Sequence, residues 1–505
     1  MSPAESPQQA AIDFLQNPAH HSGRAVTRID THAAMVFLDR DRALKIKRQV
    51  RFPFLDYSTL AKRKQACDAE IEVNQPFAPA IYRGVVAITR QADGMLALGG
   101  DGEPIEYAVD MNRFNENQTL DHLAATGRID SALADRLGRA VATAHDKAPV
   151  VEDAKFADTL AEIVEQNDGE LRGHPDLFAP DQIDALSEAT RAALTRLRAL
   201  LIARERDGLV RRCHGDLHLG NIVLIDNAPV LFDAIEFNPA FAIGDTFYDL
   251  AFLLMDLIER GLTSAANIVL NRYLIETGND GDLDALALLP LFLSVRAAIR
   301  AKVTAARPNR DAAIDQNARD YFALAQKLIA PPPPQLIAVG GLSGTGKSLL
   351  ARALAADLAP LPGAIVLRSD VTRKTLFNVA ETDRLPADAY TKDVTAKVYA
   401  TLGAKAARVL AAGHSAIVDA VFAKADERQA VAAVGTDGFR GLFLTADLAT
   451  RVARVGSRTG DASDADATIA HAQEHYDLGP LAWQEVDAAG TPDDTLQRSK
   501  AALGL

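Results

Sequence analysis

The sequence predicts a multidomain α/β chain with two unlike parts. The first part has a small β lobe and a larger helical lobe, and the second is a three-layer α/β/α domain around a parallel sheet. Strand patterns gather between residues 26 and about 110, helical patterns dominate from there to residue 330, and strands alternate with helices after residue 335. Such alternation is typical of a parallel sheet that carries helices on both faces.

Four consecutive prolines, Pro331 to Pro334, separate the two parts. Proline is excluded from helix interiors, and a run of prolines forms a stiff, extended connector. We therefore expect a first domain over residues 1–330, a linker over 331–334 and a second domain over 335–505. Within the first domain we expect the β lobe at about 26–110 and the helical lobe at about 111–330.

The β lobe is predicted from short apolar runs and one helical pattern. The turn Asp39-Arg40-Asp41 joins two of the runs, and the helical pattern ends before Pro79. The expected strands are 36–38, 43–47 and 85–88, and the expected helix is 63–77. In the helical lobe, two further apolar runs, 222–225 and 230–232, predict a β-hairpin between helices.

The second domain is predicted from apolar runs that alternate with longer helical patterns. Strands are expected at 335–340, 364–368, 415–419 and 441–445. Helices are expected at 346–358, 390–412, 425–434 and 448–457. No internal repeat relates the two domains.

Composition places the chain among ordinary globular proteins. Its 505 residues are 48% hydrophobic and 24% charged, and this length predicts about three compact units. The longest apolar stretch, Leu250 to Ile258, contains Asp256 and is shorter than the ~20 residues of a membrane-spanning helix. The N-terminus lacks the basic start and apolar segment of a signal peptide. These features predict no membrane partner.

Cysteine content and charge narrow the location and the partners. Only Cys67 and Cys213 are present, so no disulfide framework is expected and a reducing, cytoplasmic location fits best. The net charge is −13, from 67 acidic and 54 basic residues, which disfavours a general nucleic-acid binder. A small local basic pocket stays compatible with this charge. The oligomeric state is left open.

The first motif with chemical content is the segment His214-Gly215-Asp216-Leu217-His218-Leu219-Gly220-Asn221, followed by Asp233. Phosphoryl transfer to a hydroxyl needs a carboxylate near the acceptor and oxygen ligands for Mg²⁺. A loop can direct Asp216 and Asn221 into one cleft, and the hairpin after it returns Asp233 to the same place. We expect Asp216 to act as the base or to orient the acceptor hydroxyl, and Asn221 and Asp233 to act as metal ligands. His214 is expected to fix the loop.

This segment resembles the aminoglycoside-phosphotransferase-like branch of the protein-kinase fold, whose loop reads His-Gly-Asp-x-His-x-x-Asn. The resemblance covers about residues 26–330. It implies a lysine on a strand, paired with a glutamate on a helix, that holds the nucleotide phosphates. Lys45 and Glu70 match this pair, with Lys47 and Glu72 as rivals, since Lys47 shares the strand face of Lys45.

Residues 234–243 argue against a protein kinase. This segment alone separates Asp233 from Gly244-Asp245-Thr246-Phe247-Tyr248-Asp249, and it is too short for an activation loop or an Ala-Pro-Glu motif. Small-molecule kinases of this fold lack that loop. Asp245 and Asp249 are expected to cap the next helix and to tie down the catalytic loop.

The second motif is the complete P-loop Gly341-Leu342-Ser343-Gly344-Thr345-Gly346-Lys347-Ser348, between an expected strand and an expected helix. Its glycines let backbone N–H groups approach phosphates, and the helix N-terminus adds its dipole. The residues expected to bind the nucleotide are Gly341, Ser343, Gly344, Thr345, Gly346, Lys347 and Ser348. Lys347 should reach the β- and γ-phosphates, and Ser348 should also ligate Mg²⁺.

Two carboxylates follow neighbouring strands of the second domain. Asp370 comes directly after the strand at 364–368, where it can accept a proton from an acceptor hydroxyl. Arg373 could bind an anionic group of that acceptor. Asp419 ends the strand at 415–419 and is expected to hold Mg²⁺ through water.

Arg451, Arg454 and Arg458 are three and four residues apart, which places them on one helical face. The polar stretch after them looks like a lid that would close Arg454 and Arg458 over the transferring phosphoryl group. The Ser-Asp-x-x-Arg motif and this lid resemble those of the gluconate kinase, polynucleotide 5′-kinase and zeta-toxin group of P-loop kinases. A large motor ATPase is disfavoured by the small size of the domain.

Both motif sets are intact, so the sequence predicts a bifunctional phosphotransferase. Its cofactors are expected to be ATP, with GTP as the alternative nucleotide, and Mg²⁺. The acceptors are expected to be hydroxyl groups of small molecules such as sugars, amino sugars or polyols. Two alternatives stay open: one domain could be a nucleotide-binding regulator, or the second domain could be a polynucleotide 5′-hydroxyl kinase.

Overall fold

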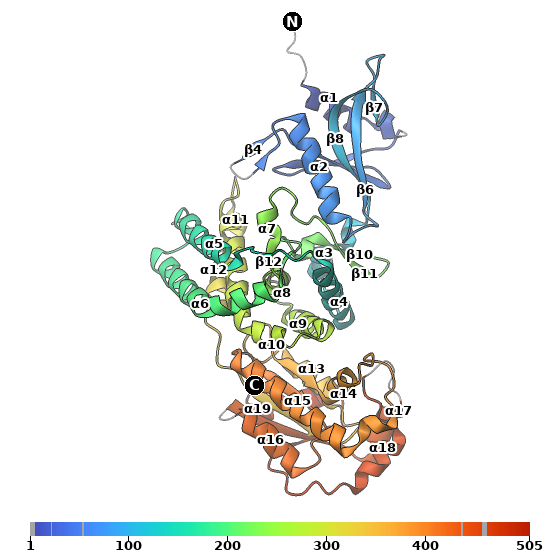
Figure 1. The fold of residues 1–505 in the computed structure, drawn as a ribbon, viewed down its shortest axis with the longest axis vertical. Coiled ribbons are helices and arrows are strands. Elements are labelled where there is room, and N and C mark those ends of the chain that lie inside the picture. Colours follow the sequence, from blue (N-terminus) through green and yellow to red (C-terminus); the bar gives the residue numbers. More distant parts are fainter. Residues whose placement is uncertain (1–5, 22, 53–54, 436–437, 457–461) are drawn as a thin grey trace. The chain divides into compact units, whose positions relative to one another are not determined.

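The computed structural model, drawn in Figure 1, describes residues 6–21, 23–52, 55–435, 438–456 and 462–505. The chain divides into two compact units. The first unit comprises Met1–Thr159 and Leu201–Asp256, and the second comprises Leu160–Leu200 and Leu257–Leu505. The boundaries between these compact units do not coincide with the four prolines. The domain boundaries at 331–334 therefore stay a prediction.

The first unit contains a six-stranded antiparallel sheet with the strand order β1-β2-β3-β8-β6-β7. Its strands are β1 (Thr27–Asp30), β2 (Ala34–Leu38), β3 (Arg42–Lys47), β6 (Tyr82–Arg90), β7 (Leu96–Leu98) and β8 (Glu103–Asn112). A short ladder, β4 (Arg51–Phe52) with β5 (Leu55–Asp56), follows β3. The three strands predicted for the β lobe lie within β2, β3 and β6.

Strand β2 of this sheet packs on both faces, which explains why apolar residues follow one another along it. Met35 and Phe37 of β2 pack on one face with Phe14 and Leu15 of the first helix. Leu38 lies on the other face, in a cluster that contains Cys67 of the next helix. Neighbouring residues of a strand point to opposite faces, so a strand covered on both sides carries an unbroken apolar run.

The first unit also contains helices and two short ladders. Its helices are α1 (Pro7–Gln16), α2 (Leu60–Asn74), α3 (Leu120–Ala125), α4 (Ser131–Lys147) and α7 (Pro239–Ala242). The hairpin β10 (Ile222–Ile225) with β11 (Ala228–Leu231) and the ladder β9 (Val210–Arg212) with β12 (Ile243–Asp245) bracket the loop between β9 and β10. Three helices, α5 (Phe156–Arg172), α6 (Pro180–Arg206) and α8 (Thr246–Glu259), continue from one unit into the other.

The second unit contains a parallel five-stranded sheet with the order β14-β15-β13-β16-β17. Its strands are β13 (Leu336–Gly341), β14 (Ile365–Arg368), β15 (Ala416–Asp419), β16 (Phe439–Thr445) and β17 (Gln484–Asp487). Its helices are α13 (Lys347–Ala355), α14 (Ser369–Leu376), α15 (Lys392–Ala411), α16 (Ala425–Gly435), α17 (Leu448–Gly456), α18 (Ala467–Ala472) and α19 (Pro492–Leu503). The four predicted strands and four predicted helices of this region are present.

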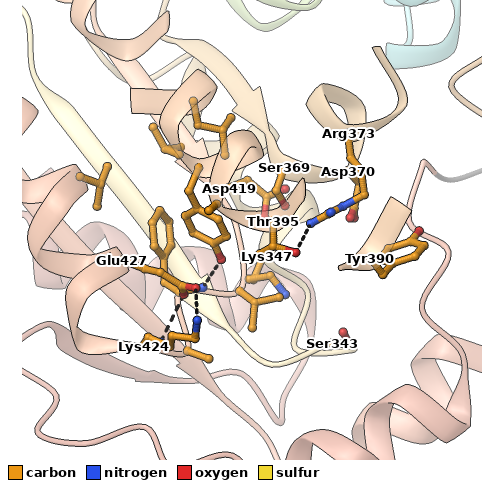
Figure 2. Close-up of a pocket in the computed structure, with 18 of the residues that line it drawn as sticks. Ser343, Lys347, Ser369, Asp370, Arg373, Tyr390, Thr395, Asp419, Lys424 and Glu427 are labelled. Carbon is orange, nitrogen blue, oxygen red and sulfur yellow. Dashed lines mark hydrogen bonds and ion pairs between the residues drawn. The ribbon is translucent and has the colours of Figure 1, made fainter. Parts of the chain in front are cut away.

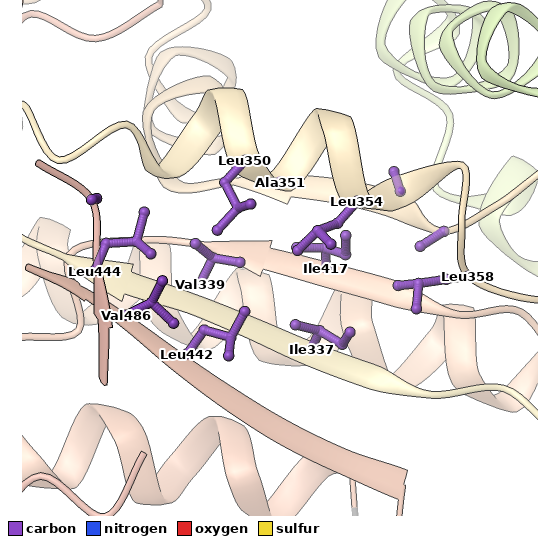
Figure 3. Packing of buried hydrophobic residues seen from close by; sticks show 13 residues of the cluster. Ile337, Val339, Leu350, Ala351, Leu354, Leu358, Ile417, Leu442, Leu444 and Val486 are labelled. Atoms are coloured by element: carbon purple, nitrogen blue, oxygen red, sulfur yellow. The ribbon is translucent and has the colours of Figure 1, made fainter. Parts of the chain in front are cut away.

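Helix α13 packs on one face of the parallel sheet (Figure 3). Its Leu350 and Leu354 meet Ile337 and Val339 of β13, together with Ile417, Leu442, Leu444 and Val486 from the neighbouring strands. Leu336 points to the opposite face, where it lies against Gly435 of α16. The sheet is thus covered on both faces, which confirms the predicted fold class for this part of the chain.

The rest of the second unit is helical. Besides the parts of α5 and α6 that belong to it, it contains α9 (Thr263–Thr277), α10 (Gly281–Ala285), α11 (Leu289–Ala305) and α12 (Ala312–Ile329). The Oγ of Ser294 on α11 donates to the carbonyl of Ala325 on α12 at 2.8 Å, within a buried helix pair. Among the described residues, no helix has both the length and the apolar character needed to cross a membrane.

Candidate active sites

The first candidate site is built on the loop between β9 and β10. Gly215 makes the turn with a φ of 83°, and a Cβ there would lie 3.1 Å from the Cα of Ala242. Asp249 of α8 holds the loop from beneath, since its carboxylate accepts from the backbone N–H of His214 at 3.3 Å and of Gly215 at 2.8 Å. The predicted role of Asp249 in tying down the loop is therefore confirmed.

His214 connects this loop to the strand that leads to Asp233. Its Nε2 lies 2.9 Å from the carbonyl oxygen of Phe232, as expected of a residue that fixes the loop. Burial lowers the pKa of His214, so the imidazole is held in its neutral form, with Nε2 as the donor. The hairpin register adds a second link, because the backbone N–H of Phe232 donates to the carbonyl of Asn221 at 3.0 Å.

The structure brings Asn221 and Asp216 into direct contact. Nδ2 of Asn221 donates to the backbone carbonyl and to the Oδ2 of Asp216, each at 3.0 Å. The imidazole of His218 lies 3.4 Å from the same carboxylate. Asp216 is thus oriented by two residues of its own motif, and it lines the same cavity as Asp233.

Lys45 and Glu70 meet as the resemblance implied. Nζ of Lys45 lies 2.8 Å from Oε1 of Glu70 and 2.7 Å from Oδ1 of Asp233. Burial by itself lowers the pKa of Lys45, but the charges of Asp233 and Glu70 outweigh it and hold the pKa well above its usual value. Lys45 is therefore a permanent cation beside the predicted metal ligand.

The rival residues Lys47 and Glu72 have different surroundings. Lys47 is 2% exposed, binds Oε2 of Glu70 at 2.6 Å and pairs with Glu236. Glu72 has a side chain that is 77% exposed and lies 3.9 Å from Arg212. The geometry favours Lys45 with Glu70 as the phosphate-holding pair, because only Lys45 also reaches Asp233 among these contacts.

Glu70 forms ion pairs with both lysines. Burial alone would raise its pKa, but Lys45 and then Lys47 outweigh burial and lower the pKa to about 2. Glu236, the partner of Lys47, is a site residue that sequence reasoning missed. Its only signal in the sequence is its position three residues after Asp233.

A cavity of about 460 Å³ connects these groups. It is lined by Lys45, Lys47, Glu70, Asp216, Asp233 and Glu236, and by apolar side chains of β2, β3 and the segment after β8. A cleft that combines charged side chains, two lysines among them, with apolar ones fits a nucleotide. Asp233 and the nearby Asn221 offer the oxygen atoms that Mg²⁺ prefers.

The second candidate site is the P-loop between β13 and α13. Its backbone leaves no room for side chains at two glycines. A Cβ on Gly344 would lie 2.4 Å from the carbonyl oxygen of Arg451, and one on Gly341 would lie 2.6 Å from that of Leu444. The loop is held from outside as well, since the Oε1 of Gln473 accepts from the backbone N–H of Ser343 at 2.7 Å. This cradle at a helix N-terminus fits a phosphate chain.

Lys347 and Ser348, the first residues of α13, line a cavity of about 1140 Å³. Nζ of Lys347 donates to the backbone carbonyl of Leu342 at 3.1 Å, which keeps the lysine over the loop. Thr345 braces the loop with its Oγ1, which donates to the same carbonyl at 2.8 Å. A hydroxyl and a nearby carboxylate are a plausible donor set for Mg²⁺, and Ser348 shares this cavity with Asp419.

Asp370 and Asp419 both lie in this cavity (Figure 2). Asp419 is the register partner of Arg368 at the ends of β15 and β14, and Nε of Arg368 lies 3.4 Å from its carboxylate. Burial and the charge of Asp419 raise the pKa of Asp370, while Arg368 and Lys347 act in the opposite direction. A carboxylate with a raised pKa is a stronger proton acceptor once ionised. Sequence reasoning assigned no role to Arg368, which directly precedes Ser369 and Asp370.

Arg373 also lines this cavity. Its guanidinium stands 5.0 Å from the ring centre of Tyr390, and it donates to the carbonyl of Ala389 at 2.6 Å and to Thr395 at 3.4 Å (Figure 2). Tyr390 is anchored in turn, because its hydroxyl donates to Asp464 at 2.6 Å.

The predicted lid arginines have separate surroundings. Arg451 is buried, contacts the carbonyl of Ser343 at 3.4 Å and pairs with Glu474. Arg454 instead donates to the carbonyls of Ala488 at 2.7 Å and Gly490 at 2.8 Å, and it is not among the residues that line the cavity. Arg458 lies outside the described residues. The structure thus places Arg451 in contact with the P-loop, and the catalytic roles of Arg454 and Arg458 stay predictions.

Two family models match the chain. Residues 95–289 match the phosphotransferase enzyme family, and residues 336–477 match an AAA domain model of P-loop proteins. They confirm the predicted combination of a kinase-like phosphotransferase domain with a P-loop kinase domain, and with it an enzyme of the ATP-dependent phosphotransferase class. Both matches imply nucleotide binding.

Known proteins resemble the whole chain and each part of it. Rv2004c, an uncharacterized protein of Mycobacterium tuberculosis, is 29% identical over 482 residues, which cover 91% of this chain and 92% of that protein. A gluconokinase from Sinorhizobium meliloti 1021 is 22% identical, with a TM-score of 0.26, over 34% of this chain and 92% of its own. A choline/ethanolamine kinase family protein from Mesorhizobium loti is 16% identical, with a TM-score of 0.39, over 64% of this chain and 95% of its own.

Proposed function

We propose that this protein is a bifunctional phosphotransferase in which each domain transfers the γ-phosphate of ATP to a hydroxyl group of a small molecule. Sugars, amino sugars and related polyols are the proposed acceptors. One observation carries the proposal: each cavity is lined by its own aspartate and its own lysine, to which we assign proton acceptance and phosphate binding. Asp216 and Lys45 line the first cavity, and Asp370 and Lys347 line the second.

In the first cavity, Asp216 accepts the proton of the acceptor hydroxyl as its oxygen bonds to the γ-phosphorus. The bond between that phosphorus and the β–γ bridging oxygen breaks, and ADP leaves. Asn221 holds Asp216 in place through one hydrogen bond to its carboxylate and one to its backbone carbonyl, each of 3.0 Å. Lys45, fixed by Glu70, neutralises the phosphates of the nucleotide.

In the second cavity, Asp370 accepts the proton of the acceptor hydroxyl in a separate reaction of the same kind. The N–H groups of the P-loop and Lys347 hold the β- and γ-phosphates and the charge that develops on them. Arg373, beside Tyr390, binds an anionic or strongly polar group of the acceptor. Asp370 follows the carboxyl end of β14 and the P-loop follows that of β13, and in a parallel sheet these ends lie at the same edge, which supports the shared role.

Mg²⁺ would be held by Asn221 and Asp233 in the first cavity and by Ser348 and Asp419 in the second. When bound, it would neutralise negative charge on the phosphate oxygens. The residues named above supply the proton acceptors and the cations of the protein itself.

The test is ATP-dependent phosphorylation of a panel of sugars, amino sugars, polyols and nucleosides, with product identified by mass spectrometry. It compares the wild type with Asp216→Ala, Asp370→Ala and, as a control, Asp320→Ala, which alters an exposed aspartate of α12 that lines neither cavity. Asp216→Ala and Asp370→Ala are each expected to remove a different activity or product, and Asp320→Ala none.

Three outcomes would change the proposal. If one site variant keeps every activity, its domain is a nucleotide-binding regulator rather than an active kinase. If an oligonucleotide with a 5′-hydroxyl is phosphorylated and Asp370→Ala removes this activity, the second domain is a polynucleotide kinase. If GTP replaces ATP with higher kcat/KM, the nucleotide assignment is wrong.

A further inference from the structure

Helix α9, which precedes the four prolines, contacts the edge of the parallel sheet that follows them. Strand β14 is at that edge, so one side of its backbone has no strand partner among the residues that the structure describes. Asn271 of α9 fills this place: its Oδ1 accepts from the N–H of Val366 at 2.7 Å, and its Nδ2 donates to the carbonyl of Ala364 at 3.1 Å. Asn267, one helical turn earlier, donates to the same carbonyl at 3.0 Å.

Arg272, the next residue of α9, continues this contact with a charge. Its NH1 lies 2.6 Å from Oε2 of Glu381, a residue in the segment after α14. The other oxygen of Glu381, Oε1, lies 3.9 Å from NH1 of Arg368. Lys374 fixes the backbone of Glu381, since its Nζ donates to the Glu381 carbonyl at 2.8 Å.

Arg368 connects Glu381 to Asp419 in the P-loop site. Its Nε lies 3.4 Å from Oδ2 of Asp419, and the side chains of Arg368 and Asp419 are only 4% and 5% exposed. Opposite charges therefore alternate from α9 to the cavity: Arg272, Glu381, Arg368 and Asp419. Removing one partner of a buried ion pair leaves an uncompensated charge, which is strongly unfavourable.

Glu381 links Arg272 to Asp419, because its carboxylate interacts with both Arg272 and Arg368. Glu381 stands between two cations, and the ion pair with Arg272 is the shorter one. Without Arg272, the carboxylate of Glu381 has Arg368 as its remaining arginine among these contacts. Attraction between them would draw Arg368 away from Asp419 and leave that carboxylate without its buried partner.

We propose that Arg272 is a positioning residue for the P-loop site and that α9 is part of the framework of that site. Through Glu381 and Arg368, it keeps Asp419 oriented toward the cavity for Mg²⁺. The inference rests on the proposed function of the second domain, in which Asp419 is a metal ligand. It adds a residue from the kinase-like half of the sequence to the machinery of the P-loop half.

The test measures binding of the non-hydrolysable analogue AMPPNP, with Mg²⁺ and with EDTA, by calorimetry. All proteins carry Asp233→Ala to weaken the first site, and Lys347→Ala identifies the part of the binding that belongs to the P-loop. Arg272→Gln is expected to weaken Mg²⁺-dependent binding about 10-fold, the lower end for residues that orient a metal ligand. Binding in EDTA should not change.

Arg408→Gln is the matched control. Arg408 of α15 forms a bidentate ion pair with Asp284 of α10, at 2.6 and 3.0 Å, so its loss also removes an ion pair between the P-loop region and the helices before the prolines. None of its ion pairs leads to the cavity, since its partners are Asp280 and Asp284. It should leave Mg²⁺-dependent binding unchanged.

Two further variants separate positioning from a general effect on stability. Arg272→Lys keeps the charge and should recover most of the affinity. In the double variant Arg272→Gln, Glu381→Gln, the effects should not add, because Arg272 is proposed to act through Glu381.

The outcomes distinguish the inference from the function on which it rests. Equal losses for Arg272→Gln and Arg408→Gln, or an equal loss in EDTA, would overturn the inference alone. If Lys347→Ala removes no AMPPNP binding, the proposed function of the P-loop domain is wrong and the inference fails with it.

Discussion

Lys45 and Asp233 are 188 residues apart in the chain, and their charged atoms lie 2.7 Å from each other. Strand β3 supplies the lysine and the end of the β10–β11 hairpin supplies the aspartate. Local structure alone cannot bring the two residues together, so the contact exists only when the β lobe and the catalytic loop are both folded. The pair joins the predicted phosphate-holding cation to the predicted metal ligand.

Replacing Lys45 by methionine should remove this cation while keeping most of the side-chain volume. We expect kcat/KM of the reaction that depends on Asp216 to fall about 100-fold, as when one charge-stabilising group is lost from an active site. The reaction that depends on Asp370 should not change. Lys64→Met is the control, because Lys64 is half-exposed and pairs only with Asp68 among the ion pairs of α2. A similar loss for both variants would contradict the role given to Lys45.

The stability of the protein should decrease at acid pH through Glu70. Its pKa is lowered to about 2 in the fold, from an ordinary value of 4.5, by Lys45 and Lys47 against the effect of burial. A lowered pKa means that the stabilisation is complete above the unfolded pKa and is lost as the pH falls through the folded one. Between about pH 5 and pH 2, the free energy of unfolding should therefore fall by about 3 kcal/mol through this residue. Urea unfolding of Glu70→Gln should show a shallower pH dependence in that window, whereas parallel curves would contradict the assignment.

Gly344→Ala should block the P-loop. The added methyl group would lie 2.4 Å from the carbonyl of Arg451, and the φ of 89° at this position is unfavourable for alanine. We expect AMPPNP binding at the P-loop to weaken about 100-fold, equivalent to about 2.7 kcal/mol. Gly456→Ala, at the end of α17, is the control because a Cβ there meets no atom within 4 Å. Unchanged binding in Gly344→Ala would show that the loop can rearrange.

Asn271→Ala should loosen the edge of the parallel sheet. The N–H of Val366 would lose its acceptor, which costs about 1–2 kcal/mol when the group is shielded from water. Amide hydrogen exchange of Val366 should become faster. Asn271→Asp keeps an acceptor for this N–H but loses the donor to Ala364, so exchange at Val366 should stay slow. Equal exchange in the two variants would contradict the pairing described for Asn271.

The local motifs were predictable because their residues are close in sequence. The loop from His214 to Asn221 and the P-loop each fix their own geometry within eight residues. Strands β13 to β16 were predictable because they are buried and apolar. Strand β17 was missed, since three of its four residues are exposed and polar and only Val486 is buried. An edge strand of this kind has no apolar alternation to detect.

Other features escaped prediction for different reasons. Helix α1 has a clear start signal, Ser6 as N-cap followed by Pro7, which could have identified it. The chain of charges from Arg272 to Asp419 could not be identified, because its members come from separate elements and their pairing depends on tertiary structure. The spacing of Arg451 and Arg454 indicated one helical face, but that face is wide enough for Arg451 to meet the P-loop and Arg454 the end of β17.

The asparagine that stands in for a strand beside β14 has a consequence for dissecting the protein. A fragment that begins at Gln335 would retain the P-loop and every strand of its sheet, yet it would expose the N–H of Val366 and the carbonyl of Ala364 at an open edge. Open edges recruit other strands, so such a fragment should self-associate. A fragment that begins before Thr263, the first residue of α9, is longer, but it keeps Asn271 in contact with Val366 and Ala364 and should therefore stay monomeric.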